Sequence, residues 1–165
     1  MAIELLISPE PIFHKPRHDL ESIFFVFIYL CTNLSGPGST RSLQELRELE
    51  SLPIAAWFNP AYSLERLGAD KISALMLMSQ RILPYFSPYF NDLKNCATKL
   101  FHAIFPDTMS LLHPPNIRHN DIIQIFDDTL AELPIDEPRT STPQQKCSLG
   151  MHDDALVVFM GIPAP

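Results

Sequence analysis

The longest unbroken apolar run of the chain covers residues 23–31, which carry only Ile, Phe, Val, Tyr, Leu and Cys. Asp19 and Glu21 stand just before it. A carboxylate at the N-cap accepts hydrogen bonds from free backbone N–H groups, and negative charge in a first turn suits the helix dipole. An element that is apolar on every side must lie inside a domain. The pattern predicts a central buried helix over 19–33 with Asp19 as its N-cap, although the run also suits a fully buried strand, which its Phe, Ile and Val content favours.

Shorter stretches on both sides of this run predict further helices. Residues 1–6 fit a short helix ended by the prolines that follow, since proline keeps the residue before it out of the helical region. Ser42 and Glu45 form a capping box that begins a polar helix through residue 50. A longer helix is expected at about 66–83. Between these helices, residues 34–42 have the Gly, Pro and Ser content of a surface loop.

Two apolar stripes at helical spacing predict the later helices. The first begins at Asn91 and Asp92, and its core positions are Leu93, Ala97, Leu100, Phe101, Ile104 and Phe105. The second helix covers about 121–133, is capped by Asn116 or Asn120, and turns its acidic side to solvent. Its inward positions are Ile122, Ile123, Phe126, Leu130 and Leu133.

The C-terminal part of the chain has a different character. Residues 134–150 contain many turn-forming residues and little apolar content, so they cannot offset the entropy lost on ordering. They are expected to be a disordered linker. Residues 151–165 form an apolar tail, for which a short strand at a sheet edge and an unpaired segment are the alternatives.

Composition excludes several classes of function. The net charge of −7 and the scattered basic residues argue against a nucleic-acid surface, which needs clustered Lys and Arg. Three cysteines at wide spacing indicate a reduced compartment, and residues 23–31 are far short of the roughly 20 needed for a membrane span. A cytoplasmic or nuclear protein is therefore expected. The hydrophobic content of 46% against 19% charged residues suggests apolar surface that contacts something outside this chain.

Two short motifs resemble a known family. Ala2-Ile3-Glu4 resembles the Ala-Pro-Glu end of a protein kinase activation segment, and Asp19-Leu20-Glu21-Ser22 resembles the start of the long buried F helix that follows it. The sequence of residues 1–33 looks most like the fungal-type protein kinase family, and a looser resemblance continues to about residue 133. This order favours the helix over the strand for residues 23–31. The resemblance implies a mainly α fold, with residues 1–133 as the lower part of a kinase C-terminal lobe.

The machinery of phosphoryl transfer is not found in the sequence. No Gly-x-Gly-x-x-Gly, Val-Ala-x-Lys, His-Arg-Asp or Asp-Phe-Gly occurs in the 165 residues, and the glycine cluster at 36–38 is a turn rather than a phosphate cradle. In the family these parts precede the Ala-Pro-Glu position. The complete family uses ATP and Mg²⁺, but no residue of this chain is expected to bind them or to be catalytic.

The resemblance assigns structural roles to two residues. In kinases the residue matching Asp19 accepts hydrogen bonds from the catalytic-loop backbone, whereas an N-cap is its plain structural role. The residue matching Glu4 pairs with a buried arginine of the later helices, for which Arg81 and Arg118 are the candidates; an exposed Glu4 is the alternative. Ile3 stands where the motif usually has proline.

Other candidate chemistry is weak. His14, His18 and Asp19 would need a helix to bring both imidazoles to one metal, and Pro16 lies between the histidines, so no metal site is expected. No motif supports a serine or cysteine nucleophile. Trp57 is expected to be a core residue, with ligand stacking as the alternative.

Two functions follow from these expectations. The first is a fragment of a fungal-type Ser/Thr protein kinase, inactive alone, whose partners are the missing N-terminal kinase regions. The second is a non-catalytic helical scaffold that binds another protein through its apolar surface. Neither involves nucleic acid or a membrane.

Overall fold

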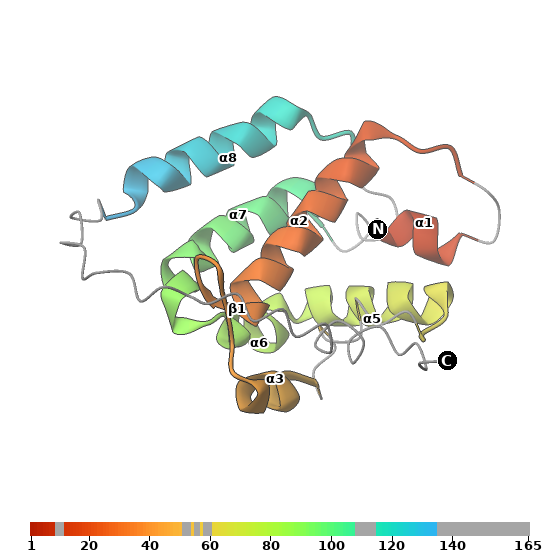
Figure 1. Ribbon diagram of the computed structural model, residues 1–165. Coiled ribbons are helices and arrows are strands. Elements are labelled where there is room, and N and C mark those ends of the chain that lie inside the picture. Colours follow the sequence, from red (N-terminus) through yellow and green to blue (C-terminus); the bar gives the residue numbers. More distant parts are fainter. Residues whose placement is uncertain (9–11, 51–53, 55–56, 58–60, 108–114, 135–165) are drawn as a thin grey trace. The chain divides into compact units, whose positions relative to one another are not determined.

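The computed structural model describes residues 1–165 except 9–11, 51–53, 55–56, 58–60, 108–114 and 135–165. Met1–Glu132 form one compact unit, to which every element below belongs, and Leu133–Pro165 form a second. The described part is mainly helical, which confirms the predicted class (Figure 1). The predicted linker, apart from Pro134, and the apolar tail at 151–165 lie outside the described residues.

The apolar run forms a helix, α2 (Pro16–Asn33), and not a strand. It begins three residues earlier than predicted because Pro16 occupies its first turn, where the missing N–H is harmless and the fixed φ angle suits a helix. The prediction that Asp19 is the N-cap is wrong, since the N-cap is Lys15 and Asp19 lies within the first turn. Proline at 16 therefore starts the helix rather than preventing it.

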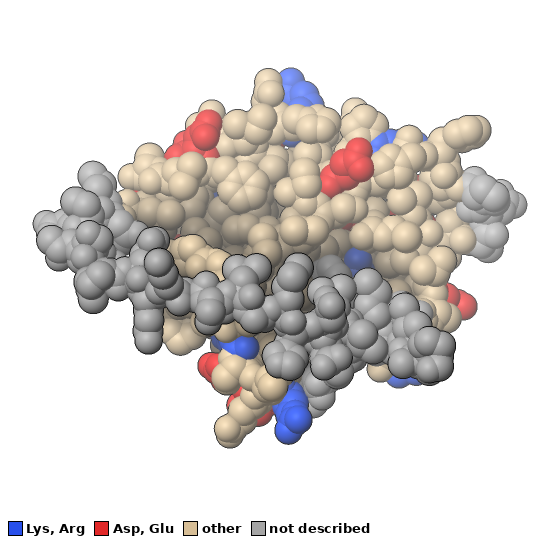
Figure 2. All heavy atoms as spheres, viewed as in Figure 1, with Lys and Arg blue, Asp and Glu red and all other residues tan. Residues whose placement is uncertain are grey.

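Helix α2 is buried on one side only. The core side carries Phe24, Phe25 and Ile28, each at most 1% exposed, whereas Ile23, Val26 and Leu30 on the other side are 40–50% exposed. The prediction that this helix is buried on every side is therefore wrong. The spacing of three and seven residues places the three exposed side chains along one face of the helix. Figure 2 shows that charged side chains are sparse over the described surface in that view.

Aromatic residues from distant parts of the chain form the core around α2. Phe24 meets Phe105 edge-on, and Phe25 meets Trp57 edge-on with ring centroids 5.2 Å apart. Trp57 is 5% exposed, which confirms it as a core residue. Edge-on ring pairs of this kind add to the stabilisation that burial gives.

Helix α1 (Ile3–Ile7) confirms the predicted N-terminal helix and packs against α5 (Leu64–Met76). The two backbones approach closely at Gly68, where an added Cβ would meet the side chains of Ile7 and Leu6. The helix predicted at 66–83 is divided: α5 ends at Met76, and α6 (Met78–Arg81) and η1 (Leu83–Tyr85) follow. The break lies at Leu77, whose φ and ψ angles of −120° and 35° are not helical.

The remaining helices follow the predicted stripes with one exception. After η2 (Pro88–Leu93), α7 (Lys94–Ile104) buries Ala97, Leu100 and Ile104 as predicted. Helix α8 (His119–Glu132) packs on α7 through Ile122, but Ile123 and Leu130 are 53% and 67% exposed, so their predicted inward direction is wrong. Asn120 lies inside α8, and the Asp121 carboxylate accepts the Arg118 N–H at 3.1 Å instead.

A small hairpin replaces part of the loop predicted at 34–42. Its strands β1 (Leu34–Gly36) and β2 (Ser39–Thr40) pair antiparallel around a turn in which Gly38 has a φ angle of +68°. Such an angle favours glycine. The predicted capping box is confirmed at α3 (Leu43–Glu50), where the Ser42 N–H donates to Glu45 and the Glu45 N–H donates to Ser42.

Replacing Gly68 by alanine tests the close packing of α1 on α5. On an unobstructed helix the change would add up to about 1 kcal/mol through helix propensity. Here the new methyl group meets Ile7, and overpacking costs about 1–3 kcal/mol. We expect a net loss of up to about 2 kcal/mol in the free energy of unfolding, measured by urea denaturation.

The double variant Gly68→Ala/Ile7→Ala is the matched control, because it shortens the side chain that obstructs the methyl group. Neighbouring residues that share space give non-additive effects. Gly68→Ala should therefore cost less in the Ile7→Ala background than in the wild type. An equal cost in both backgrounds would rule out Ile7 as the obstacle.

Candidate functional site

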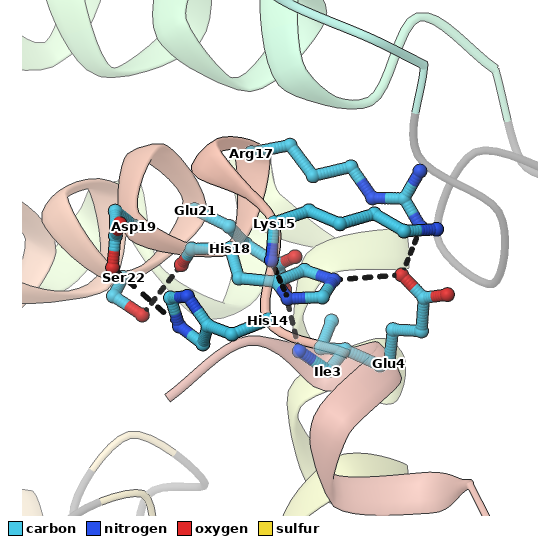
Figure 3. Close-up of polar contacts among 9 residues, drawn as sticks. All are labelled: Ile3, Glu4, His14, Lys15, Arg17, His18, Asp19, Glu21 and Ser22. Atoms are coloured by element: carbon cyan, nitrogen blue, oxygen red, sulfur yellow. Dashed lines mark hydrogen bonds and ion pairs between the residues drawn. The ribbon is translucent and has the colours of Figure 1, made fainter. Parts of the chain in front are cut away.

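The two sequence motifs meet where α1 contacts the first turns of α2. We call this group the α1–α2 polar cluster: Glu4, Arg17, His18 and Glu21, with the backbone of Ile3 (Figure 3). Glu4 Oε2 accepts hydrogen bonds from Arg17 Nη2 and from His18 Nε2, the latter at 2.9 Å. One carboxylate oxygen of α1 is thus bonded to two side chains of α2.

His18 is held at both ring nitrogens and is fully buried. Its Nδ1 accepts the Lys15 N–H at 3.1 Å, so the proton of the neutral ring is on Nε2, which donates to Glu4. The ring therefore satisfies one free N–H of the α2 N-terminus and orients the Glu4 carboxylate at the same time.

Glu4 is ion-paired, but not with either arginine that the sequence suggested. Arg81 lies near Ser73 with Nη1 to Oγ at 3.4 Å, and Arg118 lies near Asp121. Both candidates are wrong, because the arginine that pairs with Glu4 is Arg17, in the first turn of α2. Burial opposes ionisation of Glu4, but the hydrogen bonds from Arg17 and His18 outweigh it and lower its pKa.

Glu21 is the member of the cluster that the sequence reasoning missed. It is 1% exposed, and its Oε1 accepts the Ile3 N–H at 2.6 Å, while its buried Oε2 has no hydrogen-bond partner among the described residues. Burial raises its pKa to about 7, against the smaller opposing effects of the Ile3 N–H and Lys71. The signal was its spacing of three, four and seven residues from Phe24, Phe25 and Ile28, which places it on the buried face of α2.

Lys71 of α5 reaches the same region from the other side. It is 3% exposed, its Nζ donates to the Met1 carbonyl at 2.7 Å, and it lies 3.7 Å from the centre of the Phe25 ring. Burial lowers its pKa to about 8, although the charge of Glu21 opposes this shift. A cation over an aromatic face is attracted by the ring quadrupole, which partly replaces lost hydration.

Asp19 points away from this cluster. Its side chain is 63% exposed, and its Oδ1 lies 3.6 Å from His14 Nε2 (Figure 3). The structure therefore brings Glu4 together with His18 and Arg17 but leaves Asp19 directed to solvent. Because Lys15 and not Asp19 is the N-cap, the Asp19 carboxylate is not used to start its own helix.

The described residues offer structural ion pairing rather than reactive groups. Among them, no three His, Cys, Asp or Glu side chains are grouped as metal ligands. The thiols of Cys31 and Cys96 are buried, and burial raises both pKa values, that of Cys31 to about 12, so neither is an activated nucleophile. None of the helices in the described part is long and apolar enough to span a bilayer.

Comparison with known families matches residues 1–31 to the family described as fungal protein kinase. The match covers α1 and most of α2, and with them the whole α1–α2 polar cluster and Asp19. No curated protein and no solved structure matches the chain.

Glu4→Gln tests the contribution of the cluster to stability. The amide keeps the size of the side chain but removes the charge that Arg17 and His18 contact. Because hydrogen bonds to charged groups contribute about 1.5–3 kcal/mol, we expect a loss of that order at pH 7, measured by denaturant unfolding. Since the pKa of Glu4 is lowered in the folded state, the difference from wild type should shrink as the pH falls below 4.5.

Glu65→Gln on the exposed side of α5 is the control for this measurement. Surface changes away from specific contacts usually alter stability by less than about 0.5 kcal/mol. If the two variants lost the same small amount, Glu4 would contribute no more than an ordinary surface charge.

Proposed function

We propose that residues 1–133 form the lower part of the C-terminal lobe of a fungal-type protein kinase. The observation that carries the proposal is the family match over residues 1–31, which includes both motifs and the contacts between them. In this proposal Ala2-Ile3-Glu4 ends the activation segment, and α2 is the buried F helix. The complete enzyme would transfer the γ-phosphate of ATP to a Ser or Thr of a protein, with Mg²⁺ as cofactor.

The position of α2 supports this role. Its inner face contributes Phe24, Phe25 and Ile28 to the core, and α7 and the hairpin pack against it. A central helix of this kind can hold elements on several sides at fixed positions. The ion pair between Glu4 and Arg17 also agrees with an activation segment whose end is held on the lobe. Arg17 belongs to α2 itself, however, and not to one of the helices that follow it.

The direction of Asp19 supports a role outside this chain. An exposed carboxylate that does not cap its own helix is free to accept backbone N–H groups of an added segment. In a complete kinase that segment would be the catalytic loop. Asp19 would then be a positioning residue, which holds the catalytic residues without touching the substrate.

A non-catalytic scaffold is the second candidate, and the exposed apolar row on α2 favours it. Ile23, Val26 and Leu30 form a continuous apolar strip. The missing kinase regions or another protein could cover it. The two candidates differ in whether added kinase regions restore phosphoryl transfer.

An assay of the chain alone and of a fusion separates these candidates. The 165-residue chain should show no ATP- and Mg²⁺-dependent phosphorylation, because it has none of the phosphate-binding or metal-binding motifs. Joining the upstream part of an active fungal kinase, up to its Ala-Pro-Glu motif, ahead of Ala2 should give phosphoryl transfer. The same fusion with its catalytic-loop Asp changed to Asn is the control.

Phosphoryl transfer by the 165-residue chain alone would contradict the proposal that it holds only the lower part of the C-terminal lobe. A fusion that folds, judged by a cooperative thermal transition, but transfers no phosphate would favour the scaffold.

Asp19→Asn in the active fusion tests the positioning role. Misplacement of catalytic groups by about an ångström can lower the rate on the order of a hundredfold, and we expect kcat to fall by that order. The stability of the isolated chain should change by less than about 1 kcal/mol, the usual contribution of an exposed charge at a helix N-terminus. Asp127→Asn, on the exposed side of α8, is the matched control and should leave kcat unchanged.

An Asp19→Asn fusion with wild-type kcat would remove the proposed contact with the catalytic loop. Equal losses of folded protein and of activity would instead indicate a purely structural residue.

A further inference from the structure

Two buried ionisable side chains hold the same short stretch of backbone. Glu21 of α2 accepts the Ile3 N–H at 2.6 Å, and Lys71 of α5 donates to the Met1 carbonyl at 2.7 Å. The two side chains are 1% and 3% exposed. They reach Met1 and the first residue of α1 from two different helices, so the position of α1 depends on both.

Each of these groups is buried without full compensation for its lost hydration. In the part of the chain that the structure describes, Glu21 Oε2 has no hydrogen-bond partner. Lys71 has three N–H donors, and the contacts described for them are the Met1 carbonyl and the Phe25 ring. A buried charge with unsatisfied hydrogen-bonding capacity is costly. Separation of α1 from α2 and α5 would return both groups to water.

We propose that residues 1–7 form a proton-linked latch, which opens most readily when Glu21 and Lys71 are both charged and closes more tightly when Glu21 gains a proton. The inference rests on these contacts and on the burial of Glu21, and it does not depend on the proposed kinase function. Its consequence is that α1 is held more tightly against α2 and α5 at mildly acidic pH than at neutral pH.

The direction of the effect follows from the proton bound in each state. The pKa of Glu21 is about 7 in the closed state, whereas an opened, hydrated Glu21 has a value near 4.5. Between these values the closed state binds more protons, so opening becomes less favourable as the pH falls from 7 toward 4.5. One proton changes the opening constant by at most about tenfold per pH unit.

The groups that face Glu21 and Lys71 limit the useful pH window. Glu21 faces Lys71, the Met1 amino group and Glu4, and Lys71 faces Glu21 and the Met1 amino group. The lowered pKa of Lys71, about 8 against an ordinary 10.5, acts above pH 8 and favours closing as the pH rises. The pKa of the Met1 amino group is lowered from 8.0 by burial, so this group acts below pH 8 and also favours closing as the pH rises. The lowered pKa of Glu4, set by Arg17 and His18, acts below 4.5 and favours opening there. Between pH 5 and 7 Glu21 is thus the group that favours closing as the pH falls, and its replacement isolates its contribution.

Hydrogen exchange of the full chain tests the latch. The opening constant of the Ile3 amide and of the α1 amides is obtained at pH 5, 6 and 7 after correction for intrinsic exchange. We expect it to fall at least tenfold from pH 7 to pH 5. The α1 amides should also exchange faster than those of α7, because the latch opens without global unfolding. Exchange of α1 only together with α7 would overturn the proposal.

Glu21→Gln and Lys71→Met separate the two groups. The glutamine oxygen can still accept the Ile3 N–H but does not titrate, so the fall of the opening constant from pH 7 to pH 5 should vanish. Lys71→Met keeps an apolar contact with Phe25 and removes a positive charge near Glu21, so the acid-side dependence should persist. Glu65→Gln, exposed on α5, should behave as the wild type. An unchanged pH dependence in Glu21→Gln, or its loss in Lys71→Met, would refute the latch.

Discussion

The hydrogen bond from the Ile3 N–H to Glu21 is the contact on which the arrangement of the N-terminal half depends. A carboxylate that is almost fully buried needs a donor, and Glu21 has the backbone of Ile3. To supply it, the first residue of α1 must lie directly against the start of α2. The absence of a side chain at Gly68 then lets α1 settle on α5, and Lys71 reaches the Met1 carbonyl from there. Glu4 is placed by the same approach within reach of Arg17 and His18.

Helix α2 has one apolar face that packs in the core and a second apolar face that is exposed. The aromatic residues on its inner face account for the core, together with Trp57 and Phe105. Its outer face exposes an apolar row that no described residue covers fully. A soluble helix normally carries polar residues on such a face. This imbalance agrees with the high apolar content of the sequence and is the reason that both proposed functions include a further partner.

Periodicity and capping signals in the sequence predicted most of the helices, because those signals act locally. The Ser42 and Glu45 capping box and the buried stripe of α7 are examples. The site was predicted less well. Asp19 was chosen as N-cap because it directly precedes the apolar run, but Pro16 begins the helix earlier. Glu21 was read as a first-turn charge, although its spacing from Phe24 and Phe25 marks the buried face. The pairing of Glu4 with Arg17 depends on how α1 lies against the first turn of α2, which no local pattern specifies.

Under the proposed kinase relationship, isoleucine at position 3 in place of the proline of Ala-Pro-Glu has a physical explanation in these contacts. Proline, the residue usual at this place in the Ala-Pro-Glu motif, has no N–H and could not donate to Glu21. A buried carboxylate at position 21 and a residue with an N–H at position 3 therefore require each other. Proline at position 3 would remove the donor of Glu21 Oε1. An unsatisfied buried acceptor costs about 1–3 kcal/mol, and more when the group is charged. The same pair also explains why Lys71 is tolerated in the core, since the charge of Glu21 compensates part of its lost hydration. Ile3, Glu21 and Lys71 are thus best understood as one interdependent set, in which the N–H at position 3 is part of how this chain buries its charges.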